Sequence, residues 1–120
     1  MQYDTDLISP HKDLFLATRK YLLSFSGMIE VKKDRITTYA YKSPVLLNKN
    51  QSTKNTGGNI CHMRTMSHGI DLGFLKGARM KDDLELLQGK GKAMRVLSLS
   101  LLNKDAVKYY VDQAILLNEG

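Results

Sequence analysis

Residues 69–75 have the sequence Gly-Ile-Asp-Leu-Gly-Phe-Leu, and this stretch decides the fold class. Ile70, Leu72 and Phe74 alternate with a carboxylate and a glycine, so a strand here turns its large apolar side chains to one face. The opposite face then meets water or a ligand. A sheet with one apolar face needs a second layer of structure to bury it, and amphipathic helices supply such layers.

Two amphipathic segments flank the central strands. In one of them apolar side chains recur at three- and four-residue steps after a Ser9-Pro10 start, and Gly27 can take the left-handed conformation that stops a helix. In the other, Asn103 is a good N-cap and the same spacing follows it from Val107 to Leu117. The sequence therefore predicts a first helix over about 10–25 and a last helix that begins after Asn103.

The segment between these helices changes to strand-like patterns. Residues rich in β-branched, aromatic or alternating apolar side chains predict strands over 36–41, 60–65, 69–75 and 94–99, and Pro44 indicates a new strand or an edge at 45–47. Residues 48–59 contain no large apolar side chain and predict a mobile loop. A short helix is expected over 82–88, ended by Gly89.

The expected fold is α+β. Short connections favour a mostly antiparallel sheet of four or five strands, and the N- and C-terminal helices are expected to pack on one face as a two-layer sandwich. A length of 120 residues fits one domain over 1–120. The acidic N-terminus lacks a signal-peptide pattern, the longest apolar runs are far too short to span a membrane, and the single cysteine fits a reducing compartment. We therefore expect a cytoplasmic protein without a membrane partner.

The net charge of +6 is unevenly distributed. Residues 1–31 and 96–120 are each at −1, whereas residues 32–95 are at +8. Much of this excess falls on two segments that combine glycine with cations, which we call the glycine–cation segments: 73–79 and 89–95. Flexible backbone beside Lys and Arg suits an anion such as phosphate, although neither segment matches a nucleotide-binding motif.

Metal and nucleophilic chemistry find little support. Cys61 and His62 are neighbours on an expected strand, so their side chains point to opposite faces, and His68 is the only further imidazole nearby. No orienting group accompanies the thiol, and a buried structural cysteine is the favoured interpretation. The sequence thus predicts no metal ligand, no cofactor and no catalytic residue, and favours a protein that is not an enzyme.

Nucleic-acid binding is an alternative for a basic central sheet. Tyr39, Tyr41 and Phe74 lie on expected strands and could stack on bases beside basic side chains, as in sheet-based single-strand binders. No sequence pattern of such binders is present, and Phe74 is expected in the core.

The second half of the chain resembles a known family. The residues Gly69-Ile70-Asp71-Leu72-Gly73-Phe74-Leu75-Lys76-Gly77-Ala78-Arg79-Met80 are followed by Leu86-Leu87-Gln88-Gly89-Lys90-Gly91-Lys92-Ala93-Met94-Arg95. Together they resemble the YdhG-like family of small bacterial domains of unknown function. The resemblance implies terminal helices that flank a sheet, and some members of the family have been likened to frataxins, which handle iron for iron–sulfur cluster assembly. Frataxin-type iron handling is thus an alternative function, although the first helix here is more basic than acidic.

The hypothesis favoured by the residues is a non-enzymatic binding module for an anionic small molecule or protein partner. Its expected ligand-binding residues are four cations of the glycine–cation segments, two tyrosines and one carboxylate: Lys76, Arg79, Lys92, Arg95, Tyr39, Tyr41 and Asp71.

Overall fold

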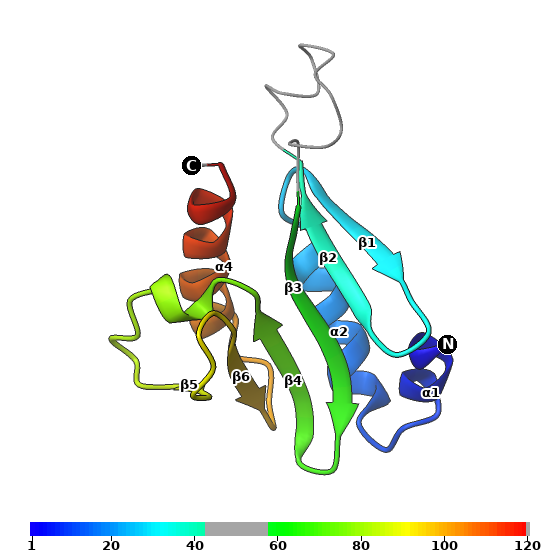
Figure 1. Ribbon diagram of the computed structural model, residues 1–120. Helices are drawn as coiled ribbons and strands as arrows, with labels where there is room; N and C mark the ends of the chain where they lie inside the picture. Colours follow the sequence, from blue (N-terminus) through cyan, green and yellow to red (C-terminus); the bar gives the residue numbers. More distant parts are fainter. Residues whose placement is uncertain (43–57, 120) are drawn as a thin grey trace.

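A computed structural model describes residues 1–42 and 58–119 of the chain (Figure 1). In chain order its elements are the helices and strands α1 (Gln2–Leu7), α2 (Lys12–Leu23), β1 (Met28–Lys32), β2 (Thr37–Tyr41), β3 (Asn59–Met66), β4 (Gly69–Phe74), the 3-10 turn η1 (Gly77–Arg79), β5 (Leu87–Gln88), β6 (Arg95–Leu99) and α4 (Lys104–Glu119). The α+β class is confirmed. The expected strand at 45–47, and all of the expected loop at 48–59 except its last two residues, lie outside the described part.

The strands form one six-stranded sheet in the order β1-β2-β3-β4-β6-β5, with every neighbouring pair antiparallel. Four of these strands match the expected ones at 36–41, 60–65, 69–75 and 94–99. The two further strands, β1 and β5, are the edges of the sheet. The described sheet therefore has six strands rather than the four or five expected.

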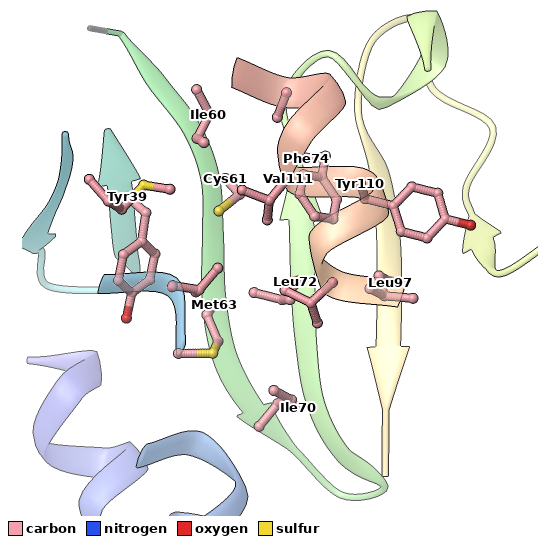
Figure 2. Packing of buried hydrophobic residues seen from close by; sticks show 14 of the residues in the cluster. Tyr39, Ile60, Cys61, Met63, Ile70, Leu72, Phe74, Leu97, Tyr110 and Val111 are labelled. Carbon is pink, nitrogen blue, oxygen red and sulfur yellow. The ribbon is translucent and has the colours of Figure 1, made fainter. Parts of the chain in front are cut away.

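One face of the sheet is apolar and covered by helices. Met63, Leu72 and Leu97 lie opposite one another on β3, β4 and β6, and all three are completely buried. Helices α2 and α4 contribute buried side chains to the same cluster, among them Phe15 and Val111. In Figure 2, Val111 lies close to Phe74 and Leu72. Burial of each such side chain stabilises the fold by about 1.5–3 kcal/mol.

The ends of the two long helices follow from local chemistry. Asn103 caps α4 as expected, because its Oδ1 accepts a hydrogen bond from Ala106 N at 3.1 Å. Helix α2 begins two residues later than the Ser9-Pro10 start, since Ser9 Oγ accepts from His11 N at 3.0 Å within the preceding turn. Gly27 has a φ of +89°, and a Cβ there would lie 2.3 Å from Lys42 O, so only glycine fits. No described helix is long and apolar enough to cross a membrane.

The helix expected over 82–88 is wrong. Asp82 Oδ1 accepts hydrogen bonds from Leu86 N at 3.0 Å and Leu87 N at 3.4 Å, and Glu85 N donates to Asp82 O at 2.9 Å, which holds the chain in a turn instead of a helix. Glu85 within this turn has a φ of 57°, outside the helical region. Leu87 and Gln88 then pair with β6 as strand β5, so sheet pairing replaces the helix at the end of the segment.

Candidate functional site

The structure brings the two glycine–cation segments together. Ala78 N, in η1, donates a hydrogen bond to Ala93 O at 2.7 Å. Gly77 lies against the start of β6 so closely that a Cβ would be 2.5 Å from the Cβ of Arg95 and 2.8 Å from its backbone nitrogen. Glycine at position 77 is therefore what allows η1 to pack on β6. The basic residues on either side of this contact, Lys76, Arg79, Lys92 and Arg95, form what we call the basic edge.

Two of the four cations have internal partners. Arg95 Nη1 donates to Gly91 O at 2.6 Å and to Met94 O at 2.8 Å, so this guanidinium closes the loop that precedes β6. Lys76 Nζ donates to Leu117 O at 3.0 Å in the last turn of α4, where a cation also meets the negative end of the helix dipole. Both side chains thus contribute positive charge to the basic edge and also form hydrogen bonds that stabilise the local backbone.

Arg79 and Lys92 are the free cations of the basic edge. Both are exposed, and neither side chain makes a hydrogen bond or ion pair with another described residue. In the nearest acidic segment along the chain, Asp82 is already engaged by backbone N–H groups and by the hydroxyl of Tyr110, and the exposed Asp83 and Glu85 form no ion pair with another described residue. The positive charge of Arg79 and Lys92 is therefore available to a ligand.

The expected tyrosines lie elsewhere, on β2. Tyr39 is completely buried on the helix-covered face, and its hydroxyl donates to Glu30 Oε2 at 2.9 Å. Burial, reinforced by the charge and hydrogen bond of Glu30, raises the pKa of Tyr39 far above its usual range. Tyr41 is 8% exposed on the same strand. Because β3 and β4 separate β2 from β6, the two strands are about 14 Å apart at the usual strand spacing.

Asp71 lies on the opposite face of the sheet, which no described helix covers and which we call the uncovered face. Its Oδ1 accepts hydrogen bonds from Ser98 Oγ at 2.8 Å and from His68 Nε2 at 2.8 Å, and Arg64 lies directly across from it on β3. The structure thus places Asp71, Lys76 and Arg95 in three different environments. The structure brings together the two segments that carry the four expected cations, but the side chains of Lys76 and Arg95 contact different carbonyls. The two tyrosines and Asp71 lie apart from this contact.

His62 belongs to the uncovered face and was not among the expected site residues. Its ring lies over Gly73, its partner on β4, and its Nε2 is 3.1 Å from Met94 Sδ. Burial, together with the nearby charge of Arg64, lowers the pKa of His62 below its usual range. The sequence signal for this arrangement is a glycine that stands directly across from an imidazole in the β3–β4 hairpin.

Cys61 and His62 point to opposite faces, as expected for neighbours on a strand. Cys61 is completely buried, and this burial raises the pKa of its thiol to about 12. A thiol with such a pKa is a poor nucleophile and a poor metal ligand at neutral pH. Among the described residues no three His, Cys, Asp or Glu side chains are grouped as metal ligands would be.

The cavities lie mainly on the helix side of the molecule. One of 630 Å³ lies where β6 ends and α4 begins, and another of 450 Å³ lies between α2 and the start of α4. A much narrower hollow is lined by Lys76, Asn59 and Asn118. Of these three cavities, only the narrow hollow is lined by a residue of the basic edge, Lys76.

Comparisons of the chain with protein-family models, curated proteins and solved structures found no match.

Proposed function

We propose that this chain is a YdhG-like domain that works as a small, non-enzymatic binding module for an anionic ligand or partner. The proposal includes the two-layer sandwich that the family resemblance implies. Its contact surface is the basic edge, and Arg79 and Lys92 are the residues that meet the anion.

One observation carries this proposal: the hydrogen bond between Ala78 and Ala93. It joins two segments that are 15 positions apart in the sequence, and it sets Arg79 and Lys92 next to the two joined residues. Hydrogen bonds to backbone carbonyls fix the side chains of Lys76 and Arg95 in the same region. Arg79 and Lys92 form no ion pair with another described residue, so a bound anion would gain favourable Coulomb energy from both.

Burial of the aromatic side chains favours a local anion over a nucleic acid. Tyr39 and Phe74 are completely buried under the helices, so their rings offer no stacking platform to a base. A partner attracted by the basic edge would therefore be recognised through charge rather than through base stacking.

The test uses tripolyphosphate as the probe, titrated into the protein at low and at physiological salt and followed by calorimetry. The variant Arg79→Ala/Lys92→Ala should weaken binding roughly five- to tenfold, because each exposed charge contact contributes modestly. The matched control Lys12→Ala/Lys33→Ala removes the same charge from exposed positions outside the basic edge. Equal weakening by both variants would mean that only the net charge matters, and the proposal would then be wrong.

A further inference from the structure

A second candidate site lies between the helices, away from the basic edge. It is the cavity of 450 Å³ that is lined by α2 and by the start of α4: Ala17, Lys20, Tyr21, Ser24, Leu102 and Lys104. This volume is within the range of roughly 300–1,000 Å³ that small-molecule pockets occupy. We refer to it as the helix groove.

The helix groove is positively charged. Lys20 and Lys104 come from positions far apart in the sequence and line the same hollow, and its lining contains no carboxylate. Neither lysine forms an ion pair with another described residue. The next cation along α4, Lys108, is already paired with Asp112 at 2.6 Å. The two lining lysines therefore face the groove without an anion that balances them.

The wall between the lysines is apolar and aromatic. The ring of Tyr21 is held by an edge-to-face contact with Phe25, with centroids 5.4 Å apart and an interplanar angle of 76°. Lys104 Nζ lies 5.5 Å from the centroid of the Tyr21 ring. Leu102 and Ala17 extend this surface. A flat ring can pack on the apolar part of this wall, with Lys104 Nζ over the face of the Tyr21 ring and Lys20 also lining the groove.

We propose that the helix groove binds a small aromatic anion, with its ring against Tyr21 and Leu102 and its carboxylate or phosphate group between Lys20 and Lys104. The ring of this ligand fits the apolar wall, and its anionic group balances the charge of the two lysines. The site does not depend on the basic edge, so it can be tested separately.

The experiment is a titration of the nitrogen-15-labelled protein, followed by amide chemical shifts, with four probes. 4-Hydroxybenzoate and adenosine monophosphate are aromatic anions that differ in the anionic group; inorganic phosphate supplies the charge alone, and benzyl alcohol the ring alone. At least one aromatic anion should bind, with shifts at Tyr21, Leu102 and Lys104, and should bind more tightly than both incomplete probes. The proposal is overturned if neither aromatic anion shifts these amides, or if an incomplete probe binds as tightly.

Variants locate the charge contacts. Lys20→Gln and Lys104→Gln should each weaken binding of the aromatic anion roughly two- to fivefold, as expected for one partly exposed charge contact. Lys12→Gln is the matched control, because it removes an exposed lysine of α2 that does not line the groove. Arg79→Ala/Lys92→Ala should leave this binding unchanged. If Lys12→Gln weakens binding as much as Lys20→Gln, general charge attraction explains the result and the site assignment is wrong; thermal unfolding of each variant checks that it is folded.

Discussion

The imidazole of His62 lies directly over Gly73, its partner across the β3–β4 pair. A Cβ built on Gly73 would be only 2.2 Å from Cε1 of His62 and 2.5 Å from its Nε2. The absence of a side chain at position 73 is thus what lets the imidazole lie flat on the uncovered face of the sheet.

Replacement of Gly73 by alanine should destabilise the protein. Gly73→Ala forces the His62 ring off the sheet, and overpacking of this kind costs about 1–3 kcal/mol in unfolding free energy. The control is the same change in a His62→Ala background, where no ring is in the way. There alanine should be neutral or stabilising by about 0.5–1 kcal/mol, because glycine is unfavourable within a strand. Urea unfolding of the four proteins measures the coupling, and equal effects in both backgrounds would contradict it.

Asp82 and Tyr110 connect the 80–86 segment to α4. The Tyr110 hydroxyl donates to Asp82 Oδ1, and the same carboxylate accepts from Leu86 N and Leu87 N. Tyr110→Phe keeps the buried ring and removes only the hydroxyl, so the expected loss is about 1–2 kcal/mol of unfolding free energy. Amide hydrogen exchange at Leu86 and Leu87 should also become faster.

Tyr109→Phe is the matched control for this prediction. Among the described residues, the hydroxyl of Tyr109 makes one long hydrogen bond, which it accepts from Asp83 N at 3.3 Å. Its loss should have less effect than that of the Tyr110 hydroxyl. If the two variants lose the same stability and leave amide exchange at Leu86 unchanged, the hydrogen bonds that Asp82 accepts from Leu86 and Leu87 do not depend on the Tyr110 hydroxyl.

The sequence predicted the parts of the fold that local patterns determine. Three features could be predicted because the residues that determine them are close in the chain. They are the apolar faces of α2 and α4, the Asn103 cap and the alternating pattern of β4. Strand β1 was missed because it directs Glu30 toward the helix-covered face. That carboxylate is acceptable there only because Arg19, which is 11 positions away on α2, forms two hydrogen bonds with it.

The candidate site shows the same limit. The cations of the basic edge lie on two short segments, which are joined by the Ala78–Ala93 hydrogen bond and by the pairing of Phe74 with Arg95 between β4 and β6. The distance of Tyr39 and Tyr41 from them depends on strand order, which places two strands between β2 and β6. The error at 82–88 also arose from distant partners, since the strand at Leu87 needs Leu97, and the turn before it needs the Tyr110 hydroxyl.

Asp6 fixes α1 to the sheet by completing the edge of β3. Strand β2 pairs with β3 only as far as Met63, and beyond it Asp6 Oδ1 accepts from Thr65 N at 3.0 Å and from Thr65 Oγ1 at 2.7 Å. Asp6→Ala leaves this backbone N–H without an acceptor and should cost about 1–3 kcal/mol. Asp6→Asn retains an acceptor oxygen and should lose less.

Two measurements test the role of Asp6. Urea unfolding gives the stability of each variant, and hydrogen exchange of the Thr65 amide reports the local contact. Asp4→Ala is the control, because the side chain of Asp4 is 77% exposed on the same helix. If Asp4→Ala is as costly as Asp6→Ala, the contribution of Asp6 is no more than that of any carboxylate in α1.

Glu30 should make part of the stability depend on pH. Its side chain is 9% exposed and accepts from Arg19 Nε at 2.7 Å and from Tyr39. Burial alone would raise the pKa of Glu30, but the hydrogen bonds from Arg19 and Tyr39 outweigh it, and the pKa lies below its ordinary value of 4.5. The folded state therefore favours the ionised form. This stabilisation is fully present above pH 4.5 and is lost as the pH falls through the lowered pKa of the folded state.

Glu30→Gln should remove this contribution. At pH 7 the variant should be less stable than the original protein by about 1–3 kcal/mol, because the guanidinium of Arg19 loses its charged partner. As the pH falls below 4.5, the carboxylate is protonated first in the unfolded state and then in the folded state, so the difference should shrink. Urea unfolding at a series of pH values measures it, with Glu85→Gln, an exposed glutamate, as the control. A difference that stays constant between pH 7 and pH 3 would show that the charge of Glu30 contributes nothing to stability.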